Sequence, residues 1–241
     1  MGGLGVYKFL DLPVPSRTSA LGGNTIALQD DDFTLSFQNP ALLIPSVSNQ
    51  AAFSIVDYFG DIRHGFTGYA RTLPKVGTLA ASMQFVNYGT FQSADEYGNI
   101  EGTFKAADYS FNLSCARQLD SVISYGLTLK TIYSKYERYT SVGSAADFGL
   151  TYRFPKRNLT FGLVLRNFGY QWKSFSGNGR EELNKTSQIA ICKRVPKAPF
   201  RLSLAYQYLE KWNLQYSDPA NPAPTEDPFT GEPIKDNKLK D

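Results

Sequence analysis

The stretch that decides the fold is NLTFGLVLRNFGY, residues 158–170. Its large apolar side chains recur at every second position, as on one face of a β-strand: Leu159, Phe161, Leu163 and Leu165. The alternate positions hold small residues and then Arg166, a permanent cation beside the apolar run. A strand buried on both faces does not tolerate such a charge. The stretch therefore predicts a strand with one apolar face and one polar face.

The same two-residue period continues along the chain and predicts nine strands. They are expected at residues 50–58, 62–71, 76–88, 103–117, 121–135, 145–154, 158–168, 186–195 and 200–210. In each clear case the apolar face is large and often aromatic, whereas the other face carries small or charged residues. The charged residues on these polar faces are Lys130, Asp147, Arg153, Arg166 and Arg201.

The composition favours strands and argues against nucleic-acid binding. The 241 residues include 17 Phe, 15 Tyr and 2 Trp, and aromatic residues favour strands, while Tyr also favours membrane–water boundaries. The net charge of +3 is weak, and no Lys/Arg cluster accompanies it. No apolar run approaches the roughly 18–20 residues of a transmembrane helix.

The connections between the predicted strands alternate in length. The short ones are TLPKVG, QLDS, PKRN and VPKAP, and the long ones fall at residues 88–102, 136–144, 169–185 and 211–241. Short turns at one end, long loops at the other and strands of about ten residues are typical of an up-and-down outer-membrane barrel. A soluble β-sandwich with Greek-key connections is the alternative. We predict an all-β fold, a transmembrane antiparallel up-and-down β-barrel.

Three domains are expected: an N-terminal plug segment at 1–49, barrel strands at 50–210, and a long, truncated surface loop at 211–241. Nine strands cannot close a bacterial barrel, which takes an even number. The start of the chain also lacks the charged and apolar regions of a signal peptide. We therefore expect the sequence to lack both a signal peptide and its last strands.

The sequence offers no catalytic set. The one histidine, His64, has no neighbours that suit a triad or a metal site, and no nucleophile elbow, P-loop or dinucleotide fingerprint appears. We therefore expect no enzymatic activity and no catalytic, cofactor-binding or metal-binding residues. The four cations on the polar faces, Lys130, Arg153, Arg166 and Arg201, could line a path for an anion. The interpretation favoured here is that the cations pair with Asp147 and with plug residues inside a filled barrel.

Residues 1–49 differ from the rest because four prolines interrupt regular structure, yet the segment is too apolar for a solvated tail. Such a segment can fill the lumen of a barrel. The segment contains Arg17, Ala20, Leu21, Gly22 and Gly23, then Asn39, Pro40, Ala41 and Leu42. This pattern resembles the N-terminal signature of the fatty-acid-transporter-like (FadL-like) outer-membrane barrels, where it forms a periplasmic-side hatch.

A longer resemblance runs over essentially the whole chain, in order. VYKFLDLPVPSRTSALGGN, FVNYGTF, ADFGLTY, GLVLRNFG and APFRLSLAYQYLEKWNLQY resemble the PorQ branch of the PorV/PorQ family of Bacteroidetes type IX secretion systems. The resemblance implies a barrel of about fourteen strands, in keeping with the even-number rule.

The same resemblance implies a non-enzymatic role in the bacterial outer membrane. Such a barrel would belong to the cell-surface attachment complex with PorU, PorV and the lipopolysaccharide-binding PorZ, and would hold PorZ through its long loops. The complex processes secreted cargo and joins it to lipopolysaccharide. The alternative function is a FadL-like channel for the uptake of hydrophobic solutes.

Overall fold

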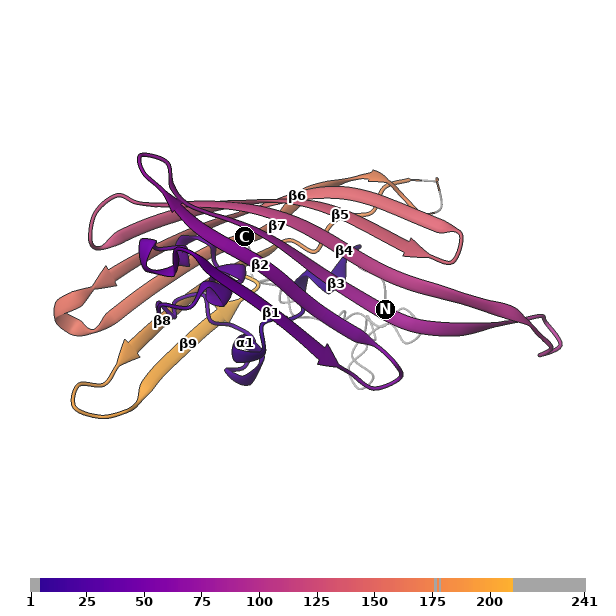
Figure 1. Cartoon of the computed structure of the whole chain (residues 1–241), viewed down its shortest axis with the longest axis horizontal. Helices are drawn as coiled ribbons and strands as arrows, with labels where there is room; N and C mark the ends of the chain where they lie inside the picture. The colour runs from indigo at the N-terminus through magenta and orange to yellow at the C-terminus, as the bar shows by residue number, and fades with distance from the viewer. Residues whose placement is uncertain (1–4, 176, 178, 210–241) are drawn as a thin grey trace, which may run out of the picture. The chain divides into compact units, whose positions relative to one another are not determined.

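The computed structural model describes residues 5–175, 177 and 179–209. These residues form one nine-stranded antiparallel sheet in which each strand pairs with the next along the chain (Figure 1). The strands are β1 (Gln50–Asp57), β2 (Arg63–Leu73), β3 (Gly77–Ala94), β4 (Ile100–Gln118), β5 (Ile123–Tyr136), β6 (Tyr139–Phe154), β7 (Leu159–Lys173), β8 (Thr186–Arg194) and β9 (Arg201–Gln207). The prediction of nine strands in an all-β, up-and-down order is confirmed. Over the described residues, no pairing joins β1 to β9.

Several predicted loops belong instead to strands. The loop predicted at 136–144 is wrong, because β5 and β6 meet in a tight turn with Glu137 in the left-handed region at φ 55°. Most of the loop predicted at 88–102 is an extension of β3 and β4, which the stacked rings of Phe91 and Phe104 support with centroids 5.2 Å apart. The loop predicted at 211–241 lies outside the described residues.

The four connections predicted to be short lie at one end of the sheet, which we call the short-turn end. They span residues 74–76, 119–122, 155–158 and 195–200. The connections at the opposite end span residues 58–62, 95–99, 137–138 and 174–185. Loop length therefore alternates less than the sequence predicted. Part of the difference arises because strands, β3 and β4 above all, extend into segments that were predicted to be loops.

The N-terminal segment, residues 5–49, packs against one face of the sheet (Figure 1). It contains α1 (Ser16–Ala20) and the short 3₁₀ turns η1 (Lys8–Asp11), η2 (Phe33–Phe37), η3 (Pro40–Leu42) and η4 (Pro45–Val47), and η5 (Pro155–Arg157) lies between β6 and β7. Pro40 and Pro45 begin their turns, a position that needs no N–H donor. None of the described helices is long and apolar enough to cross a membrane.

The apolar core lies between this segment and the face of the sheet that it covers, which we call the inner face. Phe33 and Val47 of the segment pack in one cluster with Phe66 of β2. In a second cluster, Leu42 packs with Val164 of β7. The segment therefore supplies much of the apolar surface that is buried against the inner face, as the second layer of a two-layer fold would.

The opposite, outer face carries large apolar side chains that nothing in the described chain covers. Leu113 is 66% exposed, Leu129 56% and Leu204 73%. Aromatic residues share this face, among them Phe53, Phe111, Phe148, Tyr152, Phe161 and Tyr206. The sheet is thus apolar on its open side, and its polar groups lie on the covered side.

Candidate functional site

The motif residues Asn39–Leu42 lie over a pair of glycines on the inner face. Gly126 of β5 pairs directly with Gly149 of β6. A Cβ at Gly149 would overlap Oδ1 of Asn39, and a Cβ at Gly126 would lie 2.5 Å from the carbonyl carbon of Pro40. Only glycine at these two positions lets the backbone of the segment come this close to the sheet.

Asn39 fixes the motif through both ends of its side-chain amide. Its Oδ1 accepts a hydrogen bond from the N–H of Ala41 at 3.0 Å, which caps η3, and its Nδ2 donates to the carbonyl of Ile26 at 2.7 Å. The hydroxyl of Ser124 on β5 donates to the carbonyl of Ala41 at 2.7 Å. Leu42 is buried beside β7. The second half of the predicted motif therefore attaches the segment to the sheet.

The first half of the motif forms α1 and its end. Gly22 and Gly23 have φ of 86° and 84°, and the N–H of Gly23 donates to the carbonyl of Thr18 at 2.8 Å, which closes the helix. Ala20 and Leu21 are exposed. Arg17 binds Asp30 at 2.5 Å and Asp32 at 2.7 Å, so it folds the acidic turn back onto α1.

Hydrogen bonds hold Asp32 in its ionised form. Burial alone would raise the pKa of this carboxyl, but the hydroxyl and N–H of Thr34 and the guanidinium of Arg17 bring the pKa below its usual range.

Lys130 and Asp147 form a buried ion pair on the inner face. Nζ of Lys130 lies 2.7 Å from Oδ2 of Asp147, and the two side chains are 5% and 3% exposed. Asn167 joins them, because its Oδ1 accepts from Lys130 at 2.9 Å and its N–H donates to Oδ1 of Asp147 at 2.8 Å. Nδ2 of Asn167 donates to Oδ1 of Asp11 at 3.1 Å. The pair is therefore tied to the N-terminal segment.

Arg166 binds the same segment from within β7. Its Nη1 donates to Oε1 of Gln38 at 3.1 Å and its Nη2 to the carbonyl of Leu10 at 2.9 Å. The sequence placed Arg166 near the end of a strand, but β7 continues to Lys173 and the residue is 2% exposed.

A β-bulge lets Arg166 and Asn167 face inward together. The register between β6 and β7 shifts between Ala146 and Phe148, and Asn167 has φ of 60°. The extra residue on β7 breaks the alternation, so two successive side chains are buried. Asparagine tolerates the left-handed region better than most residues, but the period-2 pattern gives no sign of the bulge.

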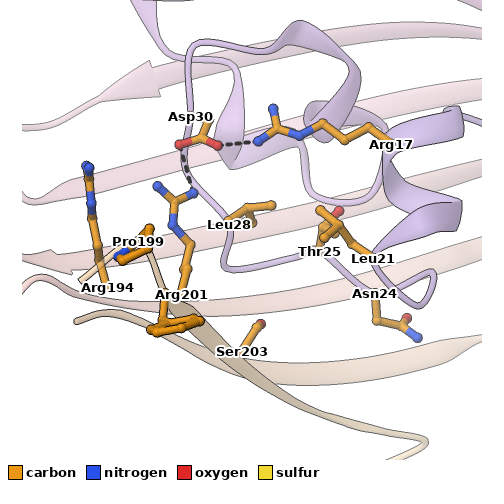
Figure 2. A pocket seen from close by; sticks show the side chains of 11 residues that line it. Arg17, Leu21, Asn24, Thr25, Leu28, Asp30, Arg194, Pro199, Arg201 and Ser203 are labelled. Carbon is orange, nitrogen blue, oxygen red and sulfur yellow. Dashed lines mark hydrogen bonds and ion pairs between the residues drawn. The ribbon is translucent and has the colours of Figure 1, made fainter.

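Two of the five charged residues predicted to face the lumen, Arg153 and Arg201, lie at the short-turn end. Nη1 of Arg201 contacts Asp30 at 2.8 Å, as the sequence predicted for a plug partner (Figure 2). Arg153 is exposed, and its Nη2 donates to the carbonyl of Ser121 in the neighbouring turn at 3.0 Å. Arg153 therefore lies at the rim rather than in the interior, because it is close to the end of β6.

A pocket of about 640 Å³ opens at the short-turn end between the segment and the β8–β9 hairpin (Figure 2). Arg17 and Arg201 approach Asp30 from opposite sides, and Arg194 lies beside them without an ion pair in the described part of the chain. Leu21, Leu28 and Phe200 are also in its lining. The pocket thus combines cationic and apolar groups.

The arrangement as a whole holds the N-terminal segment against the inner face of the sheet. Over residues 5–175, 177 and 179–209, no group of His, Cys, Asp and Glu side chains could hold a metal ion. No protein-family model matches the chain, and no curated protein matches it.

The sequence did not predict a role for the glycine pair or for Asp11, Gln38 and Asn167. The glycines gave one weak signal, since both stand at polar-face positions of their strands.

Proposed function

We propose that the chain is part of a non-enzymatic outer-membrane β-barrel of the PorV/PorQ type that anchors the attachment complex of a type IX secretion system. The observation that carries the proposal is the division of the sheet into an uncovered apolar outer face and an inner face filled by the N-terminal segment.

The outer face favours lipid as its surroundings. Contiguous exposed apolar surface in water is a site of association or aggregation, whereas hydrocarbon solvates it. The apolar side chains recur across neighbouring strands, as at Leu113, Leu129 and Phe148. β3 to β7 each exceed the roughly 9–11 residues that cross a bilayer at a tilt.

The filled inner face favours an anchor over a channel. Lys130, Asp147 and Arg166 are buried and bonded to each other, to Asn167 or to the segment, so a solute path along them would first have to break these bonds. The end opposite the short turns offers exposed aromatic residues, Tyr170 and Trp172 among them, to a protein partner. We propose a PorZ-like surface protein there, with PorU and PorV in the same complex and lipopolysaccharide bound indirectly.

The pocket at the short-turn end favours a second candidate, a FadL-like channel for hydrophobic solutes. Leu21, Leu28 and Phe200 in its lining offer apolar contact to such a solute. The two candidates differ in what disruption of the chain's gene abolishes: surface attachment of secreted cargo in the first, uptake of a labelled fatty acid in the second.

The test is isolation of the tagged protein from outer membranes, followed by mass spectrometry of what accompanies it. We expect the protein to resist carbonate extraction and to migrate differently on gels before and after heating. We also expect a PorZ-like partner to co-purify with it. Extraction by carbonate would contradict the membrane barrel. Recovery of no partner, together with loss of fatty-acid uptake on disruption, would reverse the order of the two candidates.

A further inference from the structure

The two ends of the sheet differ in charge. In the four turns of the short-turn end, the charged residues are Lys75, Lys156, Arg157 and Lys197 against the single carboxylate of Asp120. All of these side chains are exposed. In the part of the chain that the structure describes, none of the four cations enters an ion pair. The turns of this end therefore form a positive rim, and the nearby carboxylates Asp30 and Asp32 of the segment pair with Arg17 and Arg201 instead.

The opposite end has the reverse balance. Its four connections hold Asp61, Asp95, Glu96, Glu137, Glu181 and Glu182 against Arg138, Arg180 and Lys185. The two ends therefore differ in charge because of where the charged residues lie, and not because of the net charge of the whole chain, which is only +3. A uniform surface charge would not distinguish the ends.

Aromatic side chains lie on the outer face directly beside the rim. The rings of Tyr152 and Phe154 are 4.4 Å apart, and those of Phe154 and Phe161 5.7 Å apart, next to η5 with its exposed Lys156 and Arg157. Aromatic residues in membrane proteins gather at the boundary between hydrocarbon and headgroups. In a bilayer whose boundary meets these rings, the cations of the rim would lie at the level of the headgroup phosphates.

The pocket of Figure 2 belongs to the same rim and shows why a lipid suits it better than a soluble anion. Arg194 has no ion pair in the described chain, whereas Asp30 is shared by Arg17 and Arg201. Leu21 and Phe200, 53% and 65% exposed, line the same pocket. An anionic headgroup can approach the guanidinium while its acyl chains cover the apolar side chains.

We infer that the short-turn end is a binding surface for anionic phospholipid headgroups in the leaflet that this end meets. The inference rests on the proposed insertion of the sheet into a membrane. Lys and Arg near an anionic membrane surface each gain binding energy, and the gain falls off within a Debye length, about 10 Å at 0.1 M salt. The rim therefore enriches phosphatidylglycerol-type lipids over zwitterionic ones.

The test uses the full chain reconstituted in phosphatidylcholine vesicles with a trace of spin-labelled phosphatidylglycerol or spin-labelled phosphatidylcholine. Electron paramagnetic resonance measures the fraction of each label that the protein immobilises. We expect a preference of about fivefold or more for the anionic label at 0.1 M salt, and its near loss at about 1 M salt, where the Debye length is roughly 3 Å.

Two matched variants locate the surface. The rim variant, Lys156→Gln, Arg194→Gln and Lys197→Gln, should bring the preference close to one. The control, Lys105→Gln, Lys135→Gln and Lys185→Gln, removes the same charge from the opposite half of the sheet and should leave the preference unchanged.

Carbonate washing of the same vesicles separates the possible failures. Retained wild-type protein that immobilises both labels equally would overturn the lipid surface alone. A preference that survives in the rim variant, or falls equally in the control, would also overturn it. Protein removed by carbonate would overturn the membrane barrel, and the lipid surface with it.

Discussion

Asn39 joins three parts of the molecule through one side chain. Its amide caps η3, binds the carbonyl of Ile26 and lies directly on Gly149 of β6. The contact depends on the absence of a side chain at Gly149 as much as on the hydrogen bonds. A buried, doubly bonded amide of this kind specifies one position for the segment, because any shift leaves a polar group unsatisfied.

Replacement of Gly149 by alanine should loosen the N-terminal segment. The new methyl group overlaps Oδ1 of Asn39, and overpacking of this kind costs about 1–3 kcal/mol. Limited proteolysis within residues 5–49, followed on a denaturant series, measures the loss. Gly102→Ala is the matched control on β4, since a Cβ there meets nothing within 4 Å. Equal protection of the two variants would contradict the close approach.

Acidification should release the acidic turn that Arg17 holds. The folded pKa of Asp32 lies below its ordinary value of 3.8, so its contribution to stability is complete above that value. This contribution is lost as the pH falls through the lower folded pKa. Protease protection of α1 should therefore decline below about pH 4.

Two variants isolate the contribution of Asp32. Asp32→Asn should show weaker protection of α1 already at pH 7 and a smaller decline on acidification. Asp31→Asn, which removes a neighbouring carboxylate that forms no ion pair in the described chain, should titrate like the wild type. The same decline in Asp32→Asn as in the wild type would assign the pH dependence to other groups.

The alternation of inward and outward positions along a strand predicted the surroundings of a residue well only in the middle of the strands. Lys130 and Asp147 are buried on the inner face as their positions required. Arg153 has the same parity, but at the end of β6 its side chain reaches solvent and a neighbouring turn. Which segment residues meet the inner face could not be predicted, because these contacts join positions far apart in the chain.

At the scale of elements, β7 shows how one strand serves two environments. Its first half alternates, with Gly162 and Val164 buried and Phe161 on the outer face. The bulge at Asn167 then interrupts the alternation, and the strand resumes its pairing with β6 at Phe168. A bulge changes which side chains face inward without ending the strand.

A charge on the outer face of β7 should oppose membrane insertion. Leu165→Arg places a guanidinium on that face, where a cation near the bilayer midplane costs about 2–4 kcal/mol. The yield of folded, heat-modifiable protein in vesicles measures this cost. Glu96→Arg, in the exposed connection between β3 and β4, is the control and should insert normally. Equal yields from the two variants would indicate that the outer face does not meet hydrocarbon.

The sequence predicted the number and order of the strands, but not the residues at which they end. Alternation of large and small side chains located every strand, because one face of β2 to β8 is buried, much of it against the segment, and β1 and β9 keep the same alternation at the edges. The ends of β3 and β4 were missed because their outer parts extend beyond the segment, where neither face is buried and alternation is no longer required. The tight turn at Glu137 was missed for a different reason: it uses a left-handed residue other than glycine or asparagine.

At the scale of the whole molecule, we expect the described sheet and the segment to unfold as one cooperative unit. The ion pair between Lys130 and Asp147 contributes to this, because Asn167 connects it to Asp11 of the segment. A buried pair contributes little net stability, but loss of one partner leaves an uncompensated charge.

The Lys130→Met variant should therefore destabilise segment and sheet together, by about 3–5 kcal/mol. The double variant Lys130→Met, Asp147→Asn should recover part of that loss, because it removes both charges of the pair and keeps an acceptor for the N–H of Asn167. Denaturant unfolding, followed by proteolysis of the segment and by circular dichroism of the sheet, measures both parts. Loss of the segment with an unchanged sheet would contradict a single cooperative unit.

The close fit of the first fifty residues also dictates an order of events during biosynthesis. The partners of this segment come much later in the chain: Ser124 binds Ala41 across 83 positions, and Arg166 binds Leu10 across 156. The segment leaves the ribosome before these partners and is consequently among the last parts to find its contacts, and its leucines and phenylalanines stay unprotected until β7 has been made. A chaperone that binds nascent apolar segments would have to stay bound to residues 5–49 for longer than to the strands that follow.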